Sequence, residues 1–332
     1  MANNITLPPN STCLVDLTGF VHRLANTPGP HGMDPRKVTS KKTGEPTWGI
    51  VGAFNQLNSL AKLKPGRIIA FSDSSKNGFR QELLATYKQK SGSEYMGQQL
   101  KRLTQCLPLM GIPVIGGKEE FPGMEAEDLI AKACQDLKGN VVIVAYDKDL
   151  LQLVENTEQT HVYYYNPQKQ VLLDSSTLSN YIKTQFKWPV GRDLSAADLA
   201  VYLAVTGDKT DGIKSVGGIG EVTLAQYYAD LPENLNNAEK IEALAAIDAK
   251  KRAEKNQAIT ADWKRGLVNL RVSDLKTQHQ NNLNLGPMPP VKADKEAFKQ
   301  VLEDLTMGAF LAKFDNWFAP FEQAPQPSLD IE

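Results

Sequence analysis

Cysteine is scarce in this 332-residue sequence, which has only Cys13, Cys106 and Cys134 and no Cys-x-x-Cys pair. Each cysteine lies beside apolar residues, so we expect buried thiols. This disfavours a disulfide framework and a thiolate zinc site, which needs about four closely grouped ligands. Long apolar runs are missing too, since no stretch approaches the roughly 18 apolar residues that cross a membrane, and the N-terminus has no signal-peptide pattern. We therefore expect a cytoplasmic protein with no membrane partner.

A strong net charge is also missing. The 37 basic residues nearly balance the 38 acidic ones, and the formal net charge is −1. The molecule as a whole therefore does not attract a polyanion, and a nucleic acid would have to meet a local basic patch. A solvated helix face would show a similar run of charges. The richest candidate patch holds Arg80, Lys88, Lys90, Lys101 and Arg102, which oppose only Glu82 and Glu94.

The fold class follows from three apolar runs, at residues 13–15, 68–71 and 141–146, which lead into acidic residues. These runs lack the alternation of half-buried strands and are separated by helical patterns, as is typical of buried parallel strands. The sequence therefore predicts an α/β fold with a mostly parallel central sheet flanked by helices. In such sheets ligands bind beyond the carboxyl ends of the strands. The runs place Asp16, Asp73 and Asp147 there.

A change of composition near residues 188–189 predicts further regions. Residues 161–165 and 171–173 are expected to form a hairpin, and a mostly helical chain follows. The predicted organisation is an α/β domain at 1–190 with a mobile arch at about 80–105, a helical region at 191–285, C-terminal helices that pack back at 286–321, and a disordered tail at 322–332.

Four acidic groupings are the main candidates for chemistry. Each alone has a structural explanation, because Asp and Glu favour helix caps and first helical turns. At one sheet edge, however, their repulsion would raise several pKa values unless cations intervene. Oxygen ligands without histidine favour Mg²⁺ or Mn²⁺, and two such ions about 4 Å apart suit phosphodiester hydrolysis. The groupings are Asp16 with Asp73; Glu125, Glu127 and Asp128; Asp147 and Asp149; Asp208 and Asp211.

A glycine-rich segment follows Asp211 by four residues and is flanked by predicted helices. A hairpin of this kind lets backbone N–H groups approach a phosphate without reading base sequence. A tight turn between packed helices is the alternative. The segment consists of Ser215, Val216, Gly217, Gly218, Ile219 and Gly220.

In these segments the chain resembles the 5′-nuclease family, which includes flap endonucleases, phage 5′-3′ exonucleases and the 5′-nuclease domain of bacterial DNA polymerase I. The likeness covers roughly residues 12–225 and implies a PIN-like fold with a helix-hairpin-helix motif of the H3TH type. It lies in LVD at 14–16, AFSD at 70–73, Arg80 with Tyr87-Lys88, GMEAED at 123–128, DKDLLQL at 147–153 and GDKTDGI at 207–213 before the hairpin.

The resemblance implies roles for these residues. Asp16, Asp73, Glu125, Glu127 and Asp128 would line one metal site, and Asp147, Asp149, Asp208 and Asp211 a second. Lys88 and Arg80 would contact the scissile phosphate. Further DNA contacts would come from Tyr87, Lys90, Lys101, Arg102 and the hairpin, which often holds K⁺. The chain departs from the family pattern at Leu17, Glu127, Ser91 and Val222; Val222 occupies the hairpin's usual basic position.

The leading hypothesis is a structure-specific 5′-3′ exonuclease or flap endonuclease that uses two Mg²⁺ ions, with Mn²⁺ as a substitute. Its expected partner is DNA with a 5′ flap, a nick or an end, or an RNA–DNA hybrid, in primer or flap removal. We expect a monomer and separate replication proteins. A non-catalytic structure-specific DNA-binding protein with a decayed site is the alternative. A small RNA-cleaving domain is a third reading, which the hairpin disfavours.

Overall fold

The computed structural model describes residues 5–74, 78–89, 94–117, 120–186, 188, 192–258, 260–276, 282–288 and 290–322. Lys90 and Ser91 in the predicted arch, and residues 323–332 of the predicted tail, lie outside the described residues.

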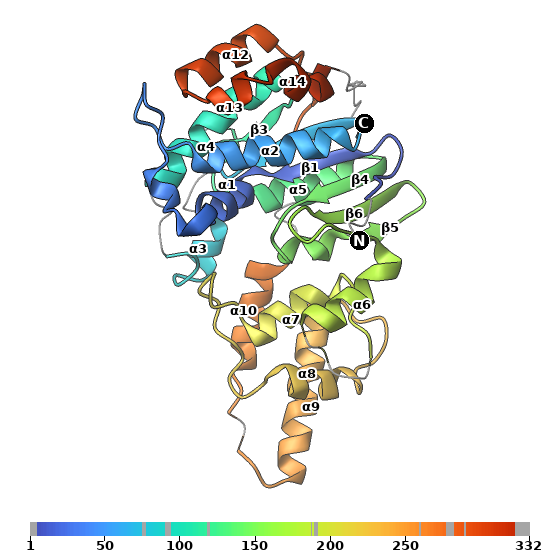
Figure 1. Cartoon of the computed structure of the whole chain (residues 1–332). Helices are drawn as coiled ribbons and strands as arrows, with labels where there is room; N and C mark the ends of the chain where they lie inside the picture. The colour runs from blue at the N-terminus through green and yellow to red at the C-terminus, as the bar shows by residue number, and fades with distance from the viewer. Residues whose placement is uncertain are drawn as a thin grey trace.

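Among the described residues, a mostly parallel sheet forms the centre of the α/β part of the molecule, as the sequence predicts (Figure 1). Its strand order is β3-β2-β1-β4-β6-β5, with β7 paired to β6. The pairs β1–β2, β1–β4, β2–β3 and β4–β6 are parallel, whereas β5 and β7 run antiparallel to β6. The predicted hairpin is therefore the β6–β7 pair. The strands are β1 Thr12–Asp16, β2 Arg67–Ser72, β3 Val114–Gly116, β4 Gly139–Val144, β5 Glu155–Asn156, β6 Thr160–Asn166 and β7 Val171–Leu173.

Helices cover both faces because successive side chains of a strand point to opposite sides. Val15 belongs to a core shared with α1, α2 and α4, and its neighbour Leu14 to a core shared with α5 and the helices α6–α10. The first layer consists of α1 Leu17–Ala25, α2 Trp48–Lys62 and α4 Glu94–Cys106. On the other face α5 Ala126–Asp136 packs on the sheet, and a helical region extends from the same core away from the sheet (Figure 1). This region consists of α6 Ser175–Gln185, α7 Asp198–Thr206, α8 Glu221–Tyr228, α9 Asn237–Glu254 and α10 Trp263–Ser273. Short helical segments lie at α3 Phe79–Leu83, η1 Pro30–Gly32, η2 Pro35–Lys37, η3 Leu107–Met110 and η4 Asp149–Leu153.

The C-terminal helices return to the sheet and pack beside α2 (Figure 1). They are α12 Lys295–Asp304, α13 Gly308–Leu311 and α14 Phe314–Glu322. Aromatic rings make this contact: Phe54 of α2 lies 5.2 Å from Phe298 and 6.1 Å from Trp317, measured between ring centroids. Burial of such large rings stabilises the packing by roughly 1.5–3 kcal/mol each.

One expectation about local structure is wrong. The polar, glycine-containing composition of residues 88–97 predicts a mobile loop within the arch, yet α4 begins at Glu94. Contacts from distant residues extend the helix: the Tyr95 hydroxyl donates to the carbonyl of Pro35 at 3.0 Å, and buried Gln99 accepts from the Gly49 N–H at 2.6 Å. The three cysteines are free and buried, as predicted. Of the helices within the described ranges, none combines the length and apolarity needed to cross a bilayer.

Candidate metal and phosphate site

Asp16 marks the point where β1 ends and α1 begins. Its Oδ1 accepts the Gly19 N–H at 2.8 Å, so the carboxylate caps α1 and is held at the carboxyl end of the central strand. Burial raises the pKa of this carboxyl to about 7; the Gly19 bond opposes the shift, and Asp73 and Asp147 add to it. A raised pKa here means that the ionised carboxylate lacks a compensating positive charge, which a bound cation would supply.

Asp73 follows the neighbouring strand β2 and joins it to α5. Its Oδ1 accepts the N–H of Ala126, the first residue of α5, at 2.8 Å. This bond brings the start of α5, with Glu125 and Glu127, to the same edge of the sheet. Burial and the charge of Glu125 raise the pKa of Asp73. Burial also raises the pKa of Glu127, against the pull of Lys88 and Arg80.

The second acidic set comes from the β4–η4 turn and the α7–α8 connection. Asp147 Oδ1 accepts the Asp149 N–H at 2.9 Å, and Asp208 Oδ1 accepts the Thr210 N–H at 2.8 Å. Lys148 Nζ lies 2.9 Å from Asp208 Oδ2 and bridges the two segments. Burial raises the pKa of Asp211 to about 6, with Lys88 opposing and Asp147 and Asp208 reinforcing the shift.

The two sets form one electrostatic cluster, because Asp147 acts on the pKa values of Asp16, Glu127, Asp149 and Asp211. Burial and the charge of Asp147 raise the pKa of Asp149. Its buried Oδ1 has no hydrogen-bond partner. Within the described ranges, no three His, Cys, Asp or Glu side chains are already drawn together as a ligand set. The residues nevertheless fit a hard cation, because an unpartnered buried carboxylate oxygen beside further carboxylates is what such an ion would satisfy.

Lys88 lies between the two acidic sets. Its Nζ is 2.8 Å from Glu125 Oε2 and 3.9 Å from Asp211 Oδ2, and its N–H donates to the Asp211 carbonyl at 2.9 Å. The residue has a φ of 41°, in the left-handed region, so this backbone bond holds it in a strained conformation. Burial resists the charge on Glu125, but Lys88 and Arg80 outweigh it and lower the Glu125 pKa to about 2. With 37% of its side chain exposed, Lys88 can also meet a ligand from solvent.

Arg80 differs from the expectation that it contacts a phosphate. Its side chain is 2% exposed, and both of its terminal nitrogens donate to Asp128, at 2.7 and 2.8 Å, while Nε donates to the Val272 carbonyl at 2.8 Å. Asp128 is fully buried, and its Oδ2 also accepts the Glu125 N–H. This buried ion pair has a structural role: it supports the segment that carries Glu125 and Glu127. The geometry argues against a phosphate contact for Arg80 and a metal contact for Asp128, since each is occupied by the other.

Tyr87 is also placed differently from the predicted DNA contact. It is 2% exposed and packs against Ile213 and Val272. Its hydroxyl donates to Glu125 Oε2 at 3.0 Å. The ring therefore positions a carboxylate from inside the protein, because a buried aromatic face cannot stack on a base.

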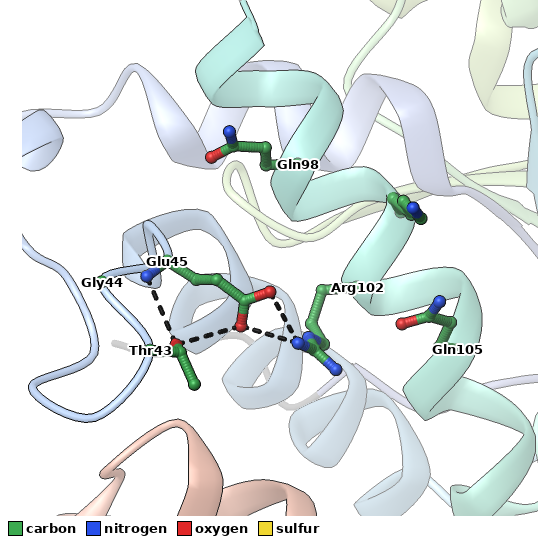
Figure 2. A pocket seen from close by; sticks show the side chains of 7 residues that line it. Thr43, Gly44, Glu45, Gln98, Arg102 and Gln105 are labelled. Atoms are coloured by element: carbon green, nitrogen blue, oxygen red, sulfur yellow. Dashed lines mark hydrogen bonds and ion pairs between the residues drawn. The ribbon is translucent and has the colours of Figure 1, made fainter.

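Lys101 and Arg102 lie on α4, facing the turn at residues 43–45 across a polar pocket of about 520 Å³ (Figure 2). Arg102 Nη2 contacts both carboxylate oxygens of Glu45, at 2.6 and 2.7 Å. Figure 2 shows Glu45 in turn contacting Thr43, so Arg102 ties this turn to α4. To make its predicted DNA contact, Arg102 would have to bind a phosphate while it remains paired with Glu45. The exposed Lys101 stays a predicted contact.

The glycine-rich segment connects α7 to α8. The Val216 side chain is buried and its N–H donates to the Val205 carbonyl at 2.8 Å. Ile219 is buried too, and its N–H donates to the Val216 carbonyl at 3.2 Å. These two residues therefore anchor the turn to the core and do not face a ligand, contrary to the prediction. The surface of the turn is formed by Ser215, Gly218 and Gly220, which are exposed, and half-buried Gly217.

Two supporting residues were not singled out from the sequence. Buried Gln152 donates to the Ser273 carbonyl at 3.0 Å and accepts the Leu275 N–H at 3.3 Å, which links η4 to the end of α10. Lys148 makes the bridge to Asp208. Both lie inside the DKDLLQL segment, so the motif contained the signal, but their roles depend on partners far along the chain.

The fold and the site define an α/β protein whose mostly parallel sheet gathers carboxylates and a lysine at its carboxyl edge. The match to a family model is specific. The chain belongs to the family described as the 5′-3′ exonuclease, N-terminal resolvase-like domain, whose model covers residues 11–183. It is therefore a nuclease of that family.

Relatives of known sequence agree. The chain is 29% identical to a 5′-3′ exonuclease of Aquifex aeolicus over 304 residues, 89% of this chain and 93% of the relative. It is 26% identical to DNA polymerase I of Pseudomonas aeruginosa, spanning 92% of this chain but only 30% of that protein. The chain thus corresponds to about a third of the polymerase.

Solved structures show the same fold at low identity. Bacteriophage T5 5′-exonuclease with bound zinc ions matches with a TM-score of 0.54 at 15% identity, covering 95% of this chain and all of that one. The catalytic core of Rad2 in complex with DNA substrate matches with a TM-score of 0.56 at 16% identity, covering 94% and 92%. Human GEN1 in complex with Holliday junction DNA gives 0.54 at 14% identity, covering 93% and 72%.

Proposed function

We propose that this chain hydrolyses DNA phosphodiester bonds near 5′ ends or flap junctions, as a 5′-3′ exonuclease or flap endonuclease in primer or flap removal. The observation that carries the proposal is the gathering of buried and half-buried carboxylates, with raised pKa values, around Lys88 at the carboxyl edge of the sheet. DNA as the substrate is supported by the relatives, which include DNA polymerase I, and by structural neighbours described in complex with DNA.

We assign the divalent cations to the acidic residues at this edge other than Asp128, because both carboxylate oxygens of Asp128 are bonded to Arg80. Two Mg²⁺ ions, with Mn²⁺ as a substitute, would supply activation of water and stabilisation of the leaving oxygen. The structural neighbour with bound zinc ions supports a dependence on divalent metal. We propose as ligands Asp16, Asp73, Glu125, Glu127, Asp147, Asp149, Asp208 and Asp211. The buried Arg80–Asp128 pair would hold α5 in place.

The protein's own cations and dipoles would bind the DNA. With Glu125 bound to a cation, the Lys88 Nζ would be free to face a phosphate, where its positive charge would stabilise the negative charge that develops. The turn at 217–220 would contact duplex backbone through N–H groups, with K⁺ as a possible companion ion. The cytoplasmic location, the monomeric state and the separate replication proteins stay predictions.

Cleavage of a 5′-labelled flap substrate tests the proposal. Wild-type protein with Mg²⁺ should release a labelled fragment, and chelation should stop the release. The Asp147→Ala/Asp149→Ala variant should lose cleavage but still bind DNA. Asp193→Ala/Asp230→Ala is the matched control, because both residues are acidic and lie in exposed ion pairs that do not belong to the cluster.

Two outcomes would contradict the proposal. Turnover that persists in the Asp147→Ala/Asp149→Ala variant would remove the carboxylates from the reaction. Wild-type protein that binds flap DNA but never cleaves it would support the non-catalytic alternative. Comparing a flap, a nick, a blunt duplex and an RNA–DNA hybrid, with the 5′ end free or blocked, would then define the substrate.

A further inference from the structure

The helix α8, which follows the turn at 215–220, contains no lysine or arginine that could bind a phosphate at the turn. Val222, the second residue of that helix, is an exposed valine with 61% of its surface accessible, and the residue before it is Glu221. Backbone N–H groups alone would leave a bound DNA phosphate only partly neutralised. A phosphate contact usually combines such donors with Lys or Arg.

A cation from another helix lies beside this turn. Arg252, near the end of α9, places its Nη2 3.5 Å from where a Cβ on Gly218 would lie. Thr260 brings its hydroxyl equally near, with Oγ1 3.4 Å from the same point. Gly218 has a φ of +78° and is exposed, so the turn presents bare backbone next to the guanidinium. Arg252 and Thr260 both follow Gly218 by more than thirty positions in the sequence, and only the fold brings them to the turn.

A buried carboxylate, that of Asp248, holds the Arg252 side chain in this position. Its Nε donates to Asp248 Oδ1 at 2.7 Å. Asp248 is fully buried and also accepts the Tyr227 hydroxyl at 2.9 Å and the Trp263 indole N–H at 3.1 Å. The Nε edge of the guanidinium is thus fixed, and Nη2 takes no part in that bond. Its neighbour Lys251 pairs instead with Asp230, at 2.7 Å.

We propose that Arg252 supplies the positive charge of a DNA-phosphate site formed with the Gly217–Gly220 turn, in place of a basic residue on α8. The inference rests on the proposed function, because it takes duplex DNA as the ligand. A guanidinium already fixed by a carboxylate loses little rotational freedom when it binds, which favours this contact over one from a mobile surface lysine.

Salt-dependent binding of a labelled 5′-flap duplex to the full-length protein, in EDTA, tests the proposal. Removing Arg252 alone would strand buried Asp248, so the test variant is Arg252→Ala/Asp248→Asn, with Asp248→Asn as its own reference. The Kd should rise about tenfold, as for one lost charge-assisted hydrogen bond. The slope of log Kd against log salt should fall by about 0.9, as for one lost phosphate contact.

Lys251→Ala is the matched control, since it removes the same charge from the adjacent position and should leave the slope unchanged. Adding Val222→Lys to the test variant should restore the slope. An unchanged slope in the test variant, or an equal loss in Lys251→Ala, would overturn the proposal.

Arginine modification of wild-type protein gives a second measurement that does not depend on folding of a variant. Flap DNA should protect Arg252 from phenylglyoxal, read by peptide mass spectrometry, and Arg252 that reacts equally with and without DNA would overturn the proposal. Cleavage by wild-type protein is measured in parallel. Lost cleavage with an intact Arg252 effect would refute the nuclease proposal alone, whereas normal cleavage without that effect would refute only this inference.

Discussion

The Nζ of Lys88 lies 2.8 Å from Oε2 of Glu125, and the same residue's backbone N–H is bonded to the carbonyl of Asp211. One lysine therefore connects the acidic set that follows β1 and β2 with the set that follows β4 and α7. Burial opposes its charge, but Glu127 and Glu125 hold the Lys88 pKa well above its usual range. The lysine stays protonated throughout the neutral range and is available to a phosphate.

Replacing this lysine should separate catalysis from folding. Lys88→Met should lower the cleavage rate about 10²–10³-fold, the usual effect of removing one donor that stabilises developing charge. Stability should change little, because the ammonium is partly exposed. Single-turnover cleavage and a urea titration measure the two effects. Lys183→Met, which removes a surface lysine paired with Asp193, should leave both unchanged; a normal rate in Lys88→Met would refute the role.

The sequence predicts the sheet and the positions of its acidic ends because that signal is local. An apolar run followed by Asp16 or Asp147 identifies a buried strand and the edge where it ends. Whether a basic side chain is buried or exposed depends on partners far along the chain, so local sequence patterns do not predict it. Arg80 is buried because Asp128 and the Val272 carbonyl, 48 and 192 residues away, accept its hydrogen bonds.

In the glycine-rich turn, too, the local sequence does not predict which side chains are buried. The sequence identifies the segment but does not separate the residues that anchor it from those that face outward. Val216 and Ile219 turn inward because they join the core of α7 and α8. The partner cation Arg252 comes from a helix for which the sequence offered only general helical character.

The Arg80–Asp128 pair should matter more for stability than for chemistry. Arg80→Met leaves a fully buried carboxylate without its ion partner and should cost about 3–5 kcal/mol of unfolding free energy. Arg80→Met/Asp128→Asn should recover most of that loss, because the amide oxygen can still accept the Glu125 N–H. Urea unfolding of both variants checks this.

The double variant also decides the role of Asp128. If the Arg80–Asp128 pair has only a structural role, the folded Arg80→Met/Asp128→Asn protein should bind Mg²⁺ as tightly as the wild type does. Calorimetry measures the two affinities. A large loss of Mg²⁺ affinity in a folded variant would return Asp128 to the metal ligands.

Gly212 fixes the contact between the segment that carries Lys88 and the one that carries Asp211. Its φ is +75°, and a Cβ there would lie 2.1 Å from the Thr86 carbonyl oxygen. Gly212→Ala should therefore cost about 1–3 kcal/mol and push the two segments apart, lowering cleavage further than stability alone explains. Gly97→Ala is the control: this glycine is inside α4 with open space around it, and alanine there should be neutral or slightly stabilising. Equal melting temperatures for wild type and Gly212→Ala would contradict the packing argument.

Metal-free protein should become less stable as pH rises from about 5 to 8. Burial raises the pKa of Asp16 to about 7 and of Asp211 to about 6, from an ordinary value of 3.8. The folded state therefore holds protons that the unfolded chain has released, and this stabilisation, complete below about pH 4, is lost as pH rises through 6 and 7. The lowered Glu125 pKa, about 2, lies outside this pH window and does not affect the trend.

Melting temperatures measured in EDTA should fall between pH 5 and 8, and Mg²⁺ should reverse the fall by binding the ionised carboxylates. Asp16→Asn/Asp211→Asn should flatten the profile, while Asp193→Asn, an exposed carboxylate with a lowered pKa, should not. A metal-free melting temperature that rises over this range would show that the cluster is not under the strain described.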